Sequence, residues 1–106
     1  EEIPIAIMIA AFKGNILDVN NKLCDMLGYS EKELKNMTHF EITKENDNKK
    51  NRIYLEKLRN KEINSFELNK QYIKKNGEYL DVHIKVKVIT DHHGEPVCDF
   101  AFISNK

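Results

Sequence analysis

Two strand-like segments open the sequence. The run from Ile5 to Phe12 is continuously apolar, which predicts a strand buried on both faces. Lys13-Gly14 is typical of a turn, and the segment from Asn15 to Val19 predicts a second strand. Together these segments predict an N-terminal hairpin.

Helix signals follow the hairpin. Asn20 is a good N-cap for a short helix from Asn21 to Leu27, and Gly28 is placed to end it. Ser30 to Glu33 is a capping-box sequence that predicts another short helix, and Thr38 to Glu41 has the same form. The pattern therefore predicts several short helices in succession.

A longer helix is predicted next. Asp47 can cap a helix that runs to about Asn60. Tyr54, Leu55 and Leu58 form an apolar stripe along it, opposed by lysines and arginines. Such a stripe indicates one face packed on the core.

The C-terminal half alternates with a period of two. Phe66, Leu68 and Tyr72 alternate with polar residues as far as Asn76-Gly77, a strong hairpin signal. The clearest half-buried strand follows, and a turn at Asp91-His92-His93-Gly94 leads into a third strand from Val97 to Ile103. The apolar positions of that middle strand are Leu80, Val82, Ile84, Val86 and Val88.

The order of elements predicts an α+β fold. Neither strand group buries a face alone, so the strands are expected to join in one five-stranded antiparallel sheet. The helices then cover one face of it. With 106 residues and no internal linker, residues 1–106 are expected to form a single domain. The chain begins at Glu1 without an initiator Met, so we expect it to be cut from a larger signalling protein.

The composition limits the kinds of binding partner that we expect. Lys plus Arg and Asp plus Glu both number 17, so the net charge is zero, and we expect no nucleic-acid partner and no direct membrane contact. Nothing reads as a signal peptide, which favours a cytoplasmic location. Cys24 and Cys98 lie in apolar segments and are expected to be buried free thiols, with a disulfide as the alternative.

Known catalytic and metal motifs are lacking. No Gly-rich phosphate loop and no assembled nucleophile and base can be found in the sequence, so we expect no enzyme activity and assign no catalytic residue. His92 and His93 lie beside Asp91 and Glu95, but adjacent side chains in a turn rarely converge on one ion. We therefore expect a solvated turn there and no metal site.

Four segments resemble the PAS domain family, in the right order. They are Gly14 to Asn20, the Gly-Tyr-Ser-containing stretch Leu27 to Leu34, Tyr72 to Gly77, and Asp91, Gly94 and Pro96 before the last strand. The resemblance implies the PAS fold, with strand order 2-1-5-4-3 and helices cupped over one face.

The resemblance also bears on cofactors. Haem-binding relatives usually supply an axial His from the long helix, and residues 48–60 contain none. Flavin-binding relatives carry a reactive Cys in the region of residues 39–47, which has none here. We therefore expect neither haem nor flavin, while an unknown small molecule could bind.

Comparison with the family implies a set of pocket-lining side chains. Lys70 and Asp99 are among them, and because buried charges need a polar partner, they suggest a polar ligand. The predicted ligand-binding residues are Tyr54, Leu55, Leu58, Leu68, Lys70, Tyr72, Val82, Ile84, Asp99, Ala101 and Ile103.

Two functions follow from the resemblance. One is a sensory domain that binds a small molecule between sheet and helices and relays a signal to an output domain in the same chain, of histidine kinase or cyclic-dinucleotide enzyme type. The alternative is a ligand-free PAS module for dimerisation or protein docking. Cys98, Phe100 and Phe102 are expected on the outer face of the last strand, which favours a homodimer in either case.

Overall fold

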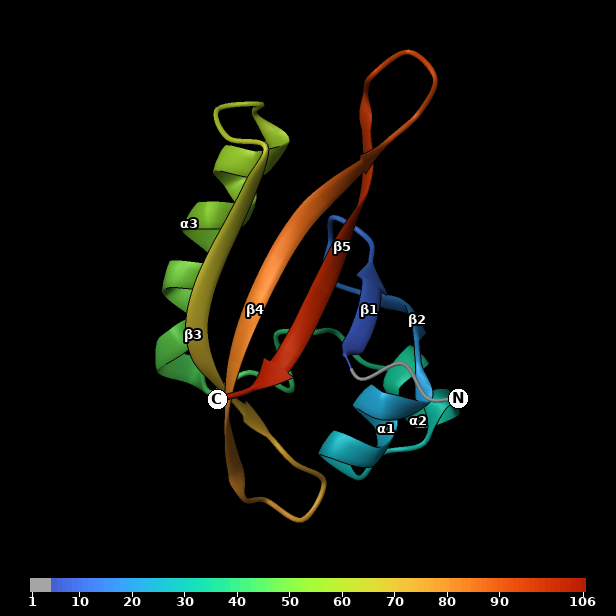
Figure 1. Cartoon of the computed structure of the whole chain (residues 1–106), viewed down its shortest axis with the longest axis vertical. Helices are drawn as coiled ribbons and strands as arrows, with labels where there is room; N and C mark the ends of the chain where they lie inside the picture. The colour runs from blue at the N-terminus through green and yellow to red at the C-terminus, as the bar shows by residue number, and fades with distance from the viewer. Residues whose placement is uncertain (1–4) are drawn as a thin grey trace.

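The computed structural model describes residues 5–106, which fold as one five-stranded antiparallel sheet with three α-helices (Figure 1). The strand order is β2-β1-β5-β4-β3, so the first and last strands lie side by side in the middle. The predicted α+β class and strand order are both confirmed. The strands are β1 (Ala6–Ala10), β2 (Ile16–Val19), β3 (Ser65–Ile73), β4 (Tyr79–Thr90) and β5 (Pro96–Asn105).

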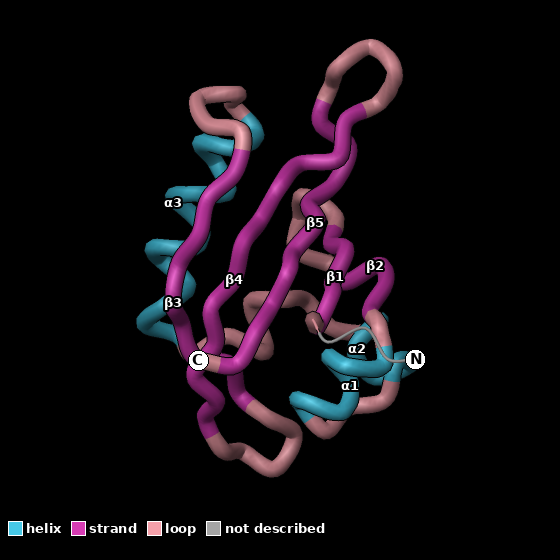
Figure 2. Tube along the Cα trace, viewed as in Figure 1, coloured by secondary structure: helices cyan, strands magenta, loops and turns pink. Residues whose placement is uncertain are grey.

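The helices lie on one face of the sheet (Figure 2). They are α1 (Asn21–Leu27), α2 (Glu31–Lys35) and α3 (Glu45–Arg59). The short helices α1 and α2 pack on the β1–β2 hairpin, and α3 runs along β3 and β4. The inner face of α3 therefore packs toward the sheet, beside the short helices rather than over them.

Local capping explains where α1 and α2 begin. The Asn20 side chain accepts a hydrogen bond from Leu23 N at 3.2 Å, and Gly28 ends α1 in the left-handed conformation. At α2, Ser30 Oγ accepts from Glu33 N, and Glu33 Oε1 accepts from Ser30 N. Both predicted N-caps are confirmed.

Two other helix predictions are wrong. Thr38 and Glu41 make the reciprocal bonds of a capping box, but the box closes a turn rather than a helix. Asp47 is not the cap of α3, because the helix already begins at Glu45. Its carboxylate instead accepts a hydrogen bond from Gln71 N at 2.8 Å, which fastens α3 to β3.

The strand β1 is fully buried on one face only. Ala6, Met8 and Ala10 point into the core, while Ile7 and Ile9 are half-buried on the outer face. The strand also ends at Ala10 rather than Phe12. The expected burial on both faces is therefore wrong, since no layer of the described chain covers the outer face.

Both cysteines are free thiols. Cys98 is buried and Cys24 is half-buried, and burial raises the pKa of each thiol. Among residues 5–106, no helix combines the length and apolar character needed to cross a membrane.

Candidate functional site

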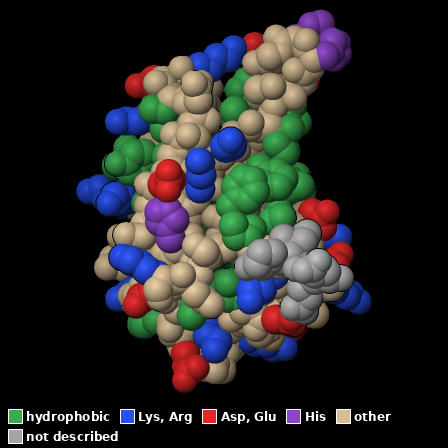
Figure 3. Space-filling view, viewed as in Figure 1, with side chains coloured by type: hydrophobic (Ala, Val, Ile, Leu, Met, Phe, Trp, Pro, Cys, Tyr) green, Lys and Arg blue, Asp and Glu red, His purple; other side chains and the backbone are tan. Residues whose placement is uncertain are grey.

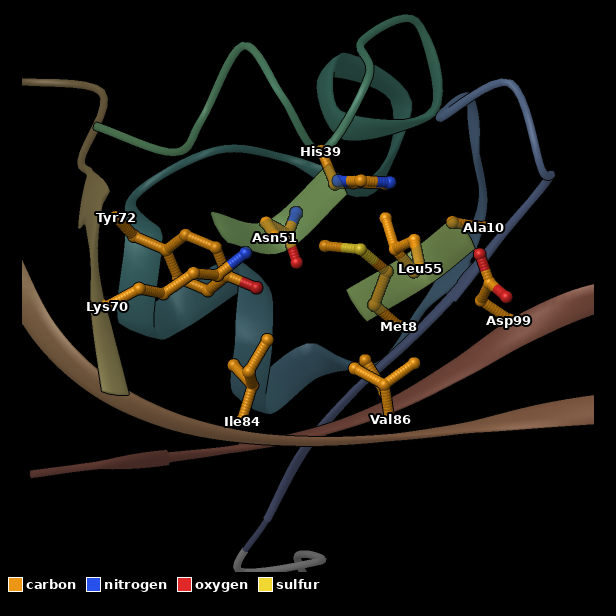
Figure 4. Close-up of a pocket in the computed structure, with 11 residues that line it drawn as sticks. Met8, Ala10, His39, Asn51, Leu55, Lys70, Tyr72, Ile84, Val86 and Asp99 are labelled. Carbon is orange, nitrogen blue, oxygen red and sulfur yellow. The ribbon is translucent and has the colours of Figure 1, made fainter. Parts of the chain in front are cut away.

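A cavity of about 30 Å³ lies between the inner face of the sheet and α3 (Figure 4). That volume holds about two or three water molecules. Its wall comes from β1, β3, β4, β5, α3 and the loop before α3. The eleven lining residues are Met8, Ala10, His39, Asn51, Leu55, Lys70, Tyr72, Ile84, Val86, Asp99 and Ala101.

Lys70 lies at one end of the cavity. Alternation along β3 turns Lys70 inward together with Tyr72, and only 5% of Lys70 is exposed. Its Nζ donates to Thr43 Oγ1 at 3.1 Å and lies 4.8 Å from the centroid of the Tyr72 ring. The Thr43 hydroxyl donates in turn to the carbonyl of His39 at 2.8 Å. One buried hydroxyl and one aromatic face therefore surround the amine.

Burial changes the acid–base behaviour of this end. It lowers the pKa of Lys70 to about 7, although the Asp47 carboxylate acts in the opposite direction. Burial also raises the pKa of the Tyr72 hydroxyl. Desolvation disfavours the charged form of both groups. At neutral pH, Lys70 is a mixture of ammonium and free amine.

Asp99 lies at the other end. Its register on β5, opposite Ala10 and Val88, turns it inward, and 3% of the residue is exposed. Arg59 Nη2 lies 3.6 Å from Asp99 Oδ2, yet neither carboxylate oxygen has a hydrogen-bond partner within residues 5–106. Burial raises the pKa of Asp99 to about 6 against the opposing influence of Arg59. This carboxyl group thus has unused hydrogen-bonding capacity.

His39 comes from the loop before α3. Its backbone N donates to Gly14 O at 2.9 Å, and its ring centroid lies 4.1 Å from that of Phe40. The residue is 6% exposed, and burial, reinforced by the positive charge of Lys70, lowers its pKa to about 3. His39 is therefore a neutral imidazole at physiological pH.

Two residues of α3 complete the wall. Asn51 and Leu55 are one helical turn apart and both face the sheet. Asn48, a turn earlier, donates to Phe40 O at 3.1 Å and holds the loop against the helix. The cavity is thus bounded by apolar side chains along its middle and by polar groups at its ends.

The structure places six of the eleven predicted residues in the cavity wall: Leu55, Lys70, Tyr72, Ile84, Asp99 and Ala101. Whether any of them touches a ligand stays a prediction. The other five do not line the cavity: Leu58, Leu68, Val82 and Ile103 pack in the core, and Tyr54 stacks on Phe66. Inward orientation alone does not place a side chain beside a void.

Five wall residues were not predicted. Met8, Ala10 and Val86 have the inward parity of their strands, so the sequence did contain a signal for them. Asn51 lies one turn before Leu55 on the same helical face. His39 belongs to an irregular loop, where no periodicity indicates the direction of a side chain.

The histidine-containing turn is remote from the cavity and projects from one end of the molecule as the β4–β5 connection (Figure 1). Asp91 Oδ1 accepts from the backbone N of His93 and of Glu95. Within the described residues, no three His, Cys, Asp or Glu side chains gather closely enough to hold a metal ion.

An antiparallel sheet in this order, with helices over one face, is the α+β architecture of PAS domains. The chain belongs to the PAS domain family, whose model matches residues 4–105. A probable diguanylate cyclase of Escherichia coli K12, DgcE, is 31% identical over 101 residues, covering 95% of this chain and 9% of that protein. The chain therefore spans less than a tenth of the length of this curated relative.

Solved structures agree with the family. The PAS domain of a Colwellia psychrerythraea protein superposes with a TM-score of 0.89 at 14% identity, covering 98% of this chain and 87% of that one. A PAS domain from Desulfitobacterium hafniense superposes with a TM-score of 0.78 at 26% identity, covering 98% of this chain and 94% of that one. A PAS domain from a two-component sensor histidine kinase superposes with a TM-score of 0.82 at 22% identity, covering 99% of this chain and 87% of that one. PAS domains of this kind are sensory modules of signalling proteins.

Proposed function

We propose that this PAS domain senses a small molecule of mixed polarity, bound between the sheet and α3. The observation that carries the proposal is the placement of Lys70 and Asp99 at opposite ends of one cavity with apolar walls. Buried charged groups are normally paired or hydrogen-bonded, because their desolvation is unfavourable. Arg59 lies 3.6 Å from the Asp99 carboxylate, but the Asp99 oxygens have no hydrogen bond within the described chain, so a ligand that donates to them would relieve the rest of that penalty.

The size of the cavity limits this ligand. About 30 Å³ admits a molecule of a few non-hydrogen atoms unless α3 moves away from the sheet. A porphyrin or an isoalloxazine ring would need such a movement. The proposal therefore favours a small metabolite over haem or flavin.

The proposal extends to the host protein. We infer that the domain is part of a longer signalling chain in the cytoplasm, has no catalysis of its own, and biases an output domain. The relative that is a probable diguanylate cyclase and the structural neighbour from a histidine kinase support this inference.

A cavity-filling substitution tests ligand binding. Ala101→Leu adds bulk to the wall and is expected to abolish retention of a small molecule that the wild type carries through purification, as measured by native mass spectrometry. Val97→Leu, on the same strand but 53% exposed, is the matched control and should retain the ligand. Equal retention by the Ala101 variant, or a wild type that retains nothing and is not stabilised by any compound in a metabolite library, would contradict the proposal.

A second candidate function is dimerisation. Ile7 pairs with Phe102 and Ile9 with Phe100 across β1 and β5, and these four side chains are only half-buried on the outer face. Figure 3 shows apolar side chains gathered over these central strands. An apolar patch of this kind is typical of an interaction surface. It supports the alternative of a docking module, and the two functions are compatible.

A further inference from the structure

We propose that Lys70 is a covalent binding site, whose ε-amino group forms a reversible imine with a short-chain aldehyde in the cavity beside α3. The inference rests on the proposed function, because it places the ligand in the same cavity. It adds the chemical class of the ligand and the bond that holds it.

The first argument is the orientation of the amine. The Thr43 hydroxyl uses its hydrogen on the His39 carbonyl, so its oxygen accepts from Lys70. This bond fixes one hydrogen of the amine. The nitrogen lies within the cavity wall, beside Tyr72 and Asn51 (Figure 4). An incoming carbonyl carbon would meet a positioned nitrogen rather than a mobile surface chain.

The second argument is the chemical state of the nitrogen. Only an unprotonated amine attacks a carbonyl, and lysines become nucleophiles when they are desolvated in an apolar pocket. Among the described residues, no carboxylate lies within ion-pair distance of Lys70 Nζ. Burial lowers the pKa of Lys70 to about 7, so a large share of it is free amine at neutral pH. At pH 7 an ordinary lysine is free amine to only about one part in 2,500.

The third argument is size and polarity. A cavity of about 30 Å³ fits an aldehyde of about two or three carbons. Met8, Leu55 and Ile84 would contact the alkyl chain.

The reaction is balanced without a further reagent. The lone pair of Lys70 Nζ forms a bond to the carbonyl carbon, and the carbon–oxygen π electrons move to oxygen, giving a carbinolamine. The nitrogen then forms a double bond to carbon while the oxygen leaves as water with both hydrogens of the amine. The groups that face the nitrogen are Asp47 from α3, His39 from the loop and Tyr72 from β3. Of these, the Asp47 carboxylate favours a protonated imine.

Reductive trapping tests the proposal. The folded domain is incubated briefly with acetaldehyde and cyanoborohydride at pH 7, and ethylated lysines are located by peptide mass spectrometry. We expect Lys70 to be labelled more than about tenfold faster than the exposed Lys87 or the half-buried Lys74, because more of it is unprotonated. Lys70→Arg keeps a cation but should lose this fast-labelled site. Labelling of Lys70 at or below the rate of the surface lysines would overturn the proposal.

A second measurement separates this inference from the proposed function. Methyl NMR signals of Met8 and Ile84 are followed with 1-propanol, which has the alkyl chain but no carbonyl. If propanol shifts these signals and Lys70 is not trapped by aldehyde, the cavity binds ligands and the imine proposal is wrong. If neither compound shifts the cavity methyls and no trapping occurs, both proposals are wrong. Shifts together with selective trapping support both.

Discussion

Lys70 gives the domain an unusual dependence of stability on pH. Below pH 7 the lysine is charged in both the folded and the unfolded chain, and the folded state bears the full desolvation penalty. Between pH 7 and 10.5, the folded pKa and the ordinary pKa, the unfolded chain binds more protons. The free energy of unfolding therefore rises with pH in that window.

The corresponding prediction concerns Lys70→Met. Removing the buried charge should raise the free energy of unfolding at pH 6 by roughly 1–3 kcal/mol. That advantage should shrink toward pH 9, where the wild type has lost most of its proton. Urea titrations at both pH values measure it, with the exposed Lys87→Met as control. A difference that does not change with pH would show that Lys70 titrates normally.

At lower pH, Asp99 has the opposite effect: it makes the free energy of unfolding fall as the pH rises. Its folded pKa of about 6 lies above the ordinary value of 3.8, so its contribution to stability is complete below pH 3.8 and is lost as the pH rises through 6. Asp99→Asn should match the wild type near pH 4 and exceed it by about 1–2 kcal/mol at pH 7. Thermal unfolding at the two pH values measures this, and a gap of equal size at both would contradict it.

The sequence could reveal some of these residues and not others. The resemblance to the family implied that Lys70 and Asp99 point inward, and the two-residue period of their strands agrees with that orientation. His39 was not predicted because its loop has no periodic pattern. The direction of its side chain depends on backbone hydrogen bonds such as the one to Gly14. Which inward side chains border a void depends on how tightly neighbours pack, which parity does not describe.

At the scale of elements, Asn20 joins three segments. Its Oδ1 accepts from Leu23 N in α1 and from Ile7 N in β1, and its Nδ2 donates to Ile5 O at 2.9 Å. The sequence indicated only the cap, whereas the other two bonds go to the first strand and the residue before it. A side chain that only capped α1 would have one of these bonds.

Asn20→Ala should lower the free energy of unfolding by about 2 kcal/mol. Roughly half comes from the lost cap, and the rest from the unpaired groups of Ile5 and Ile7. Asn20→Asp keeps the accepting oxygen and should lose less. Chemical denaturation of the three proteins measures the difference, and equal losses for Ala and Asp would show that Oδ1 is not the important atom.

The β1–β2 turn depends on Gly14. Its φ is 107°, and a Cβ added there would lie 2.6 Å from a ring carbon of Phe40. Gly14→Ala should therefore cost about 2–4 kcal/mol, from the left-handed backbone and the clash together. Gly94 has a φ of 81° with open space around it, so Gly94→Ala should cost only about 1–2 kcal/mol. Calorimetric melting compares them, and identical losses would mean that Phe40 moves aside freely.

The beginning of α3 shows the limit of capping rules. Lys44 precedes the helix without any side-chain cap, whereas Asp47, a good capping residue, is engaged by Gln71 N on β3. A tertiary contact determined the role of Asp47, and no local pattern could indicate it.

For the whole molecule, the testable surface is the outer face of β1 and β5. Phe100 and Phe102 lie with ring centroids 4.9 Å apart, flanked on β4 by Lys87 and Lys85. If this face forms the proposed homodimer, Phe100→Glu should weaken self-association at least about tenfold. Sedimentation velocity measures it, with Lys50→Glu on α3 as control. Wild-type protein that stays monomeric at high concentration would refute the dimer.

The two faces of strand β5 belong to the two proposed sites, the cavity on the inner face and the dimer surface on the outer face. Asp99 and Ala101 border the cavity. Phe100 and Phe102, which alternate with them along the strand, lie on the outer surface. Successive residues of one central strand thus separate the two sites by the thickness of the sheet. Linkage requires reciprocity: a molecule that binds the dimer more tightly than the monomer strengthens dimerisation by the corresponding factor. Measuring self-association as a function of ligand concentration would therefore report on the cavity without any probe inside it.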